Sequence, residues 1–129
     1  MHLGYTILYV PDVAAALDFW ERAFDLRRRF LADEGNYGEL DTGDTTLGFA
    51  AYGMAELHVA GGVHPHTPGG APAPVQIAFT TDDVAAAYAH ALAAGATAIS
   101  PPEQMPWGQT VAWLRDPAGV LVEIGTPVG

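Results

Sequence analysis

Cysteine and lysine are both absent from this chain of 129 residues. Without cysteine there is no disulfide framework, no thiolate metal site, no iron–sulfur cluster and no cysteine nucleophile. No apolar run approaches the ~20 residues that a membrane-spanning helix needs. The first residues also lack the basic segment followed by an apolar one that marks a secretory signal. We therefore expect a soluble, cytoplasmic protein that has no membrane partner.

Basic side chains are scarce. Fifteen acidic residues against five arginines give a formal charge of −10. Such a charge opposes binding to phosphate backbones, so we expect no nucleic-acid partner. It attracts cationic ligands, although acidic residues also serve solubility. The one basic run, Arg27 to Arg29, is predicted to keep an edge strand from aggregating.

An internal repeat organises the chain. The pentapeptide Asp-Val-Ala-Ala-Ala occurs at residues 12–16 and again at 83–87, and each copy follows an apolar, strand-like run. Each copy is predicted to open a helix that an aspartate caps, Asp12 in the first and Asp82 or Asp83 in the second. In the first helix Trp20 and Phe24 fall on the apolar stripe, so we predict both as core residues.

Strand candidates follow each helix, separated by turn signals. They are residues 26–31, 37–41 and 45–51 in the first half, and residues 97–100, 109–114 and 120–125 in the second. A short helix is predicted at 54–59. The pattern predicts an α+β fold, a single domain over residues 1–129 made of two βαβββ modules, 1–60 and 74–129. A Pro/Gly-rich linker, residues 61–73, joins them.

Two stretches of this doubled unit resemble a known family. Asp-Val-Ala-Ala-Ala-Leu-Asp-Phe-Trp at 12–20 and Leu-Arg-Asp-Pro-Ala-Gly-Val-Leu-Val-Glu-Ile at 114–124 look like the glyoxalase, bleomycin resistance and extradiol dioxygenase superfamily. Its members are also called vicinal oxygen chelate proteins. Residues 103–109, Glu-Gln-Met-Pro-Trp-Gly-Gln, are similar to its metal-free bleomycin resistance branch. The resemblance implies two modules that form a strand-lined cup, and it implies a homodimer.

The resemblance also implies where a metal would bind. Enzymatic members hold a divalent metal with side chains from the first and last strands of each module. The corresponding residues here are Tyr5 and Gln76, where histidine is common, and Gly48 and Glu123, where glutamate is common. Divalent metals need several charged or imidazole donors, and only Glu123 is one. We therefore expect no metal and no other cofactor.

A cup without a metal can still bind an organic molecule. Tyr5, Gly48, Gln76, Trp107 and Glu123 are predicted to line the site, whereas Tyr9 and Trp113 are predicted to be sheet core or dimer contacts. Phenol, indole and amide groups around one carboxylate suit a flat or cationic small molecule.

Two classes of function remain. The favoured hypothesis is a metal-independent binding protein that sequesters an aromatic or cationic, antibiotic-like compound. The alternative is an enzyme. It would be a metal-dependent lyase, isomerase or dioxygenase with an atypical site, or a metal-free enzyme in which Glu123 abstracts a proton. Glu123 is the one candidate catalytic residue. Three features favour binding without catalysis: the missing metal ligands at Tyr5, Gly48 and Gln76, the acidic charge, and the segment around Trp107.

Overall fold

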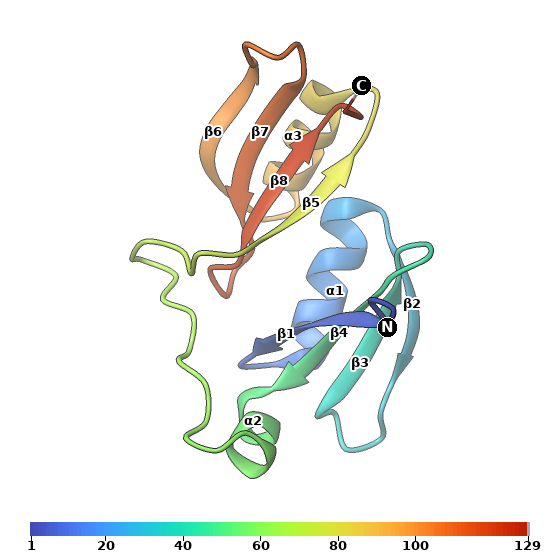
Figure 1. The fold of residues 1–129 in the computed structure, drawn as a ribbon, viewed down its shortest axis with the longest axis vertical. Helices are drawn as coiled ribbons and strands as arrows, with labels where there is room; N and C mark the ends of the chain where they lie inside the picture. The colour runs from blue at the N-terminus through green and yellow to red at the C-terminus, as the bar shows by residue number, and fades with distance from the viewer. Residues whose placement is uncertain (129) are drawn as a thin grey trace. The chain divides into compact units, whose positions relative to one another are not determined.

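The computed structural model describes residues 1–128 and divides into two compact units, unit 1 (Met1–Pro65) and unit 2 (His66–Gly129). The boundary falls inside the Pro/Gly-rich segment 61–73. Each unit packs one helix against one face of a four-stranded sheet (Figure 1). In residues 1–128 no helix is long and apolar enough to cross a membrane.

Unit 1 has the order strand, helix, three strands and a short final helix. The elements are β1 (Tyr5–Val10), α1 (Val13–Phe24), β2 (Arg27–Leu31), β3 (Tyr37–Asp41), β4 (Thr46–Ala51) and α2 (Tyr52–His58). The sheet order is β1-β4-β3-β2, in which β1 runs parallel to β4 and the other neighbours are antiparallel. The predicted short helix exists, but it begins and ends earlier than expected.

Unit 2 repeats this plan without the final helix. Its elements are β5 (Gln76–Thr80), α3 (Val84–Ala93), β6 (Thr97–Gln104), β7 (Thr110–Arg115) and β8 (Leu121–Gly125). The sheet order is β5-β8-β7-β6, with β5 parallel to β8. In Figure 1, α3 lies behind this sheet. The α+β fold of two βαβββ modules is therefore confirmed.

The two long helices begin at the predicted aspartates. Asp12 Oδ1 accepts a hydrogen bond from Ala15 N at 3.0 Å, and Asp83 Oδ1 accepts one from Ala86 N at 3.1 Å. Each bond satisfies a backbone N–H that has no partner within its helix. Beyond the first helix, Asp25 adopts a left-handed conformation with φ 54°. Asp83 rather than Asp82 is thus the cap of α3.

Each core lies between a helix and one face of its sheet. In unit 1 Trp20 is fully buried, and its ring lies 5.4 Å from that of Phe49 on β4. The prediction for Phe24 is wrong, because this side chain is only half-buried at the end of α1. Phe19, which was not predicted as a core residue, is buried. The opposite sheet face in each unit carries the polar and aromatic residues considered below.

The edge strand β6 is longer than predicted, because it continues from Thr97 to Gln104 instead of ending at Ser100. Pro101 and Pro102 lie within it, and the pairing with β7 shifts register on both sides of Ser100. Proline has no N–H to give to a neighbouring strand, so it is tolerated at such an edge.

A buried arginine on β7 holds part of the Pro/Gly-rich segment 61–73 in place within unit 2. Arg115 is 7% exposed; its Nε donates to Gly119 O at 3.0 Å and its Nη2 to Thr67 O at 2.8 Å. Its Nη1 donates to Gly70 O. Gly119 has φ +101°, and a Cβ there would lie 2.9 Å from Arg115 Nη2, so the turn requires glycine. Residues 67–70 are therefore held against the end of β7.

Candidate functional site

Three polar side chains form a hydrogen-bonded chain on the sheet of unit 2, on the face that α3 does not cover. Trp113 on β7 lies directly opposite Glu123 on β8, and Glu123 is in register with Ala78 on β5. Gln76 is two residues before Ala78, so it projects from the same face. Strand pairing therefore brings together residues separated by up to 47 positions.

The contacts within this triad run in one direction. Trp113 Nε1 donates to Gln76 Oε1 at 3.0 Å, and Gln76 Nε2 donates to Glu123 Oε1 at 3.3 Å. Gln76 is exposed, whereas Trp113 and Glu123 are half-buried. We call these residues the Trp113–Gln76–Glu123 triad. In this triad the amide of Gln76 orients the carboxylate of Glu123.

Trp107 lies farther along the same sheet, in the turn between β6 and β7. Its indole is 66% exposed, and Nε1 donates to Gln109 Oε1 at 2.9 Å. Gln109 Nε2 in turn donates to Thr126 O at 2.7 Å, just beyond β8. These residues border a pocket of about 270 Å³, lined by Trp107, Gly108, Gln109, Thr126, Pro127 and Val128. The ring is held at its edge by this bond, and an indole that is mostly exposed can stack on a planar group.

In unit 1, Gly48 occupies the position that Glu123 has in unit 2. Gly48 is in register with Ile7, the third residue of β1, just as Glu123 is with the third residue of β5. A Cβ at Gly48 would lie 2.7 Å from Tyr37 Oη, so the phenol covers this position. Tyr5, 60% exposed, projects from the first residue of β1 on the same face.

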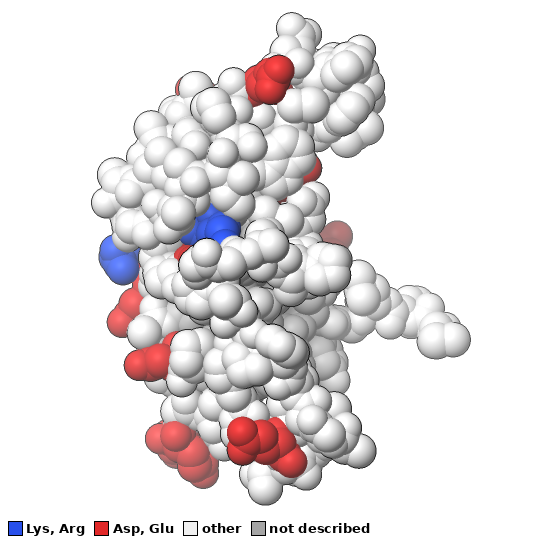
Figure 2. Space-filling model, turned by 90° about the vertical axis from the view of Figure 1, so that its left-hand side faces the viewer, with Lys and Arg blue, Asp and Glu red and all other residues white. Residues whose placement is uncertain are grey.

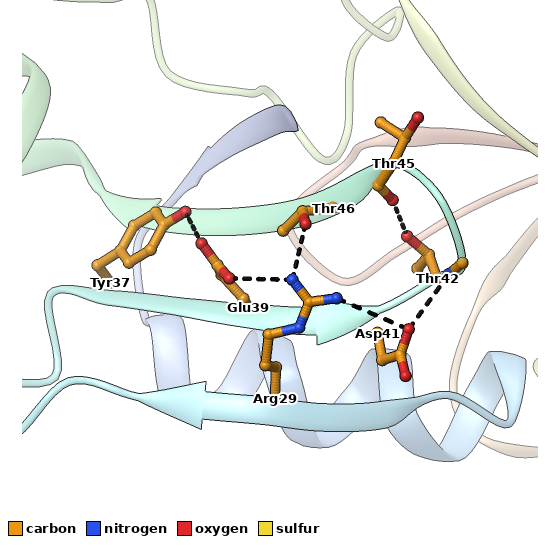
Figure 3. A network of polar contacts seen from close by, with 8 residues as sticks. Arg29, Tyr37, Glu39, Asp41, Thr42, Thr45 and Thr46 are labelled. Carbon is orange, nitrogen blue, oxygen red and sulfur yellow. Dashed lines mark hydrogen bonds and ion pairs between the residues drawn. The ribbon is translucent and has the colours of Figure 1, made fainter. Parts of the chain in front are cut away.

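Unit 1 nevertheless has a carboxylate on β3, the strand next to that of Gly48. Glu39 on β3 is in register with Gly48, and its Oε2 accepts a hydrogen bond from Tyr37 Oη at 2.6 Å (Figure 3). Burial raises the pKa of the Tyr37 phenol above its usual range, and the bond to Glu39 raises it further. The tyrosine therefore stays protonated and donates.

Arg29 completes this network from the edge strand. Figure 3 shows its guanidinium between β3 and β4, where Nη1 donates to Thr46 Oγ1 at 2.8 Å and lies 3.6 Å from Glu39 Oε1. Its Nη2 lies 3.8 Å from Asp41 Oδ1. Arg29 is the extra residue at a register shift between Arg28 and Phe30. A bulge of this kind re-aims side chains, which is why the arginine reaches across the sheet.

The predicted site residues thus fall into separate groups. Tyr5 and Gly48 share the uncovered sheet face of unit 1, and Gln76 and Glu123 are joined in unit 2. Trp107, in the turn between β6 and β7, shares a pocket with residues 126–128, which follow β8. Sequence reasoning missed Tyr37 and Glu39, although alternation along 37–41 places them on one face. It predicted Trp113 as sheet core or a dimer contact; the side chain is half-buried rather than buried, and its indole N–H is part of the triad.

The duplicated βαβββ architecture and these uncovered sheet faces define a protein of the glyoxalase-like class. The family model described as Glyoxalase/Bleomycin resistance protein/Dioxygenase superfamily matches residues 2–124, and the chain belongs to this superfamily. An uncharacterized protein of Mycobacterium bovis is 34% identical over 125 residues, which cover 94% of this chain and 80% of the relative.

Two solved structures share the fold of this chain. A glyoxalase/bleomycin resistance protein/dioxygenase family enzyme from Burkholderia phytofirmans has a TM-score of 0.80 at 24% identity, covering 98% of both chains. A lactoylglutathione lyase from Agrobacterium tumefaciens has a TM-score of 0.73 at 23% identity, covering 97% of this chain and 92% of the other. At these identities the two structures bear on the fold alone.

The residues present do not fit the divalent metal that enzymatic members of the superfamily hold. Gly48 offers no donor, and Tyr37 fills the space above it. The amide of Gln76 is already hydrogen-bonded to Trp113 and Glu123. Within residues 1–128, no three or more histidine, aspartate or glutamate side chains are grouped so that they could hold a metal ion. One carboxylate with an amide and a phenol is a poor donor set.

Proposed function

We propose that this protein binds a small aromatic or cationic organic molecule without a metal and sequesters it. The observation that carries the proposal is the Trp113–Gln76–Glu123 triad, in which a half-buried carboxylate is oriented on an uncovered sheet face. A carboxylate held in this way pairs with a cation through a charge-assisted hydrogen bond, which is about twice as strong as a neutral one.

The charge of unit 2 supports a cationic ligand. From residue 66 onward the chain has five carboxylates and one arginine, a formal charge of −4. That arginine, Arg115, is buried and donates to backbone carbonyls, so it does not offset the surface charge. Figure 2 shows one face of the molecule, on which acidic groups are scattered and basic groups are few.

Exposed rings support an aromatic ligand. Trp107 has its N–H already bonded to Gln109, so the indole offers its flat faces to a planar group. Tyr5 is similarly exposed on the sheet of unit 1. Within unit 2, a ligand that combines a ring and a positive charge would stack on Trp107 and pair with Glu123. Sequestration of an antibiotic-like compound is the role we propose for such binding, and we include the homodimer in this proposal.

A thermal-shift screen tests the proposal directly. Protein purified without a histidine tag is heated with planar aromatic cations, neutral aromatics and aromatic anions, and a stabilised complex is then titrated by calorimetry. We expect stabilisation by a cationic or aromatic member of the set. Glu123→Gln should weaken binding of a cation about tenfold to a hundredfold, the worth of a hydrogen bond to a charged group. The matched control, Asp82→Asn, removes the same charge elsewhere in unit 2.

Two results would contradict the proposal. Absence of stabilisation by every compound at millimolar concentration would refute the binding function. Stoichiometric divalent metal in the purified protein, lost in Glu123→Gln, would favour the enzymatic alternative instead. Light scattering tests the homodimer, which predicts twice the chain mass of 13.5 kDa.

A further inference from the structure

The direction of hydrogen bonding in the triad is determined at both of its ends, by Trp113 and by Glu123. An indole N–H is a donor only, so the oxygen of the Gln76 amide must face it, and this contact is 3.0 Å long. The amide nitrogen then necessarily faces Glu123 Oε1, at 3.3 Å. The reversed amide would oppose two N–H groups at Trp113 and two oxygens at Glu123. The triad therefore has one self-consistent arrangement.

This arrangement leaves the triad rich in acceptors. The indole N–H is used by Gln76, and one amide N–H is used by Glu123. An ionised carboxylate has about four acceptor positions, so one bond from Gln76 leaves most of this capacity available. A ligand that matches it must supply several N–H donors together with a positive charge.

We infer that the triad selects cations that donate hydrogen bonds, such as amidinium or primary ammonium groups, and that Trp113 is the positioning residue behind this selection. The inference rests on the proposed binding function and narrows its ligand class. Trp113 acts through Gln76, by keeping the amide N–H toward Glu123 and the carboxylate in an accepting role. Cations without N–H groups and neutral amides satisfy only part of the site.

Four small aromatic probes of similar size test the selection: benzamidinium, benzamide, phenyltrimethylammonium and benzoate. Affinities are measured by NMR titration of the full chain at low salt. We expect benzamidinium to bind at least tenfold more tightly than benzamide or phenyltrimethylammonium, and benzoate to bind most weakly.

Variants then test the positioning role. In Trp113→Phe the amide oxygen loses its donor, so the Gln76 side chain is no longer held beside Glu123. Benzamidinium affinity should therefore fall about tenfold while benzamide affinity stays unchanged. The side-chain amide resonances of Gln76, assigned with Gln76→Asn, should shift in the same variant. Gln76→Leu, which also removes the link, should lose the same discrimination if Trp113→Phe fails to fold. The Asp82→Asn control should keep it.

Each contrary outcome has a distinct meaning. If benzamidinium and benzamide bind wild type equally well, binding stands but the selection is wrong. If the preference persists in both Trp113→Phe and Gln76→Leu, the positioning role is wrong. If none of the four probes binds while the thermal-shift screen finds a ligand, this inference is wrong and the proposed function stands; if the screen also finds none, both are wrong.

Discussion

Gly48→Ala tests the close contact between Gly48 and Tyr37. The added Cβ would lie 2.7 Å from Tyr37 Oη and 3.2 Å from two ring carbons. The phenol has little freedom to retreat, because it bonds to Glu39 and packs 5.9 Å from the ring of Phe30. Overpacking of this kind costs about 1–3 kcal/mol. Replacing a glycine within a strand by alanine stabilises the fold by roughly 0.5–1 kcal/mol, because the unfolded chain loses backbone freedom. We expect a net loss of about 1–2 kcal/mol.

The clash with the hydroxyl predicts coupling between the two positions. In a Tyr37→Phe background the atom at 2.7 Å is gone and only the contacts at 3.2 Å remain. Gly48→Ala should then cost about 1 kcal/mol less than in wild type, a coupling within the range found for residues in contact.

Urea unfolding followed by tryptophan fluorescence measures these changes. Trp20 is the one tryptophan before residue 66, so a Trp107→Phe/Trp113→Phe reference makes the signal report unit 1. The midpoint should fall while the slope stays constant. A neutral or stabilising Gly48→Ala, or strictly additive costs in the double variant, would refute the contact.

Three further predictions concern Tyr37, Arg115 and Asp12. Folding raises the pKa of the Tyr37 phenol, so its contribution to stability is complete below the ordinary tyrosine pKa and is lost as pH rises through the raised value. The urea midpoint should therefore decline less steeply at alkaline pH in Tyr37→Phe than in wild type. An equally steep decline in both proteins would contradict this. Arg115→Met should lower the free energy of unfolding by about 3 kcal/mol, because three backbone carbonyls lose a charged donor. The amides of residues 67–70 should also exchange their hydrogens faster. Unchanged exchange would show that Arg115 does not hold this segment. Asp12→Ala should lower stability by about 1 kcal/mol through loss of the α1 cap, whereas Asp12→Asn, which keeps the acceptor, should be nearly neutral; equal losses in a chemical-denaturation series would argue against the cap.

Much of the fold is predictable because its signals are local. The caps at Asp12 and Asp83, the left-handed Gly95 with φ 114° and the turns between strands act over a few residues. The predicted ends of helices and strands are less accurate where pairing with a distant strand determines them. Strand β6 continues through Pro101 because β7 offers it partners beyond the proline pair.

The site was harder to predict than the fold. The repeat places Gly48 and Glu123 at equivalent positions, and alternation places Gln76 on the face of Glu123. The contact between Trp113 and Gln76 depends on the order of strands in the sheet and on side-chain rotamers, which one sequence does not reveal. Arg29 lies close to Glu39 because β2 has a bulge at this position, and the sequence of the strand gives no signal of that bulge.

The two prolines in β6 have a consequence for aggregation. A foreign strand that adds to this edge of the sheet would find neither an N–H at Pro101 nor one at Pro102, and the register shifts beside them twist the edge out of line. Extended β-sheet polymers grow by repeating such pairings from chain to chain. Growth of this kind is therefore disfavoured at β6, and the short outer strand β5 is the edge of unit 2 that must be guarded when the protein is concentrated or partly unfolded.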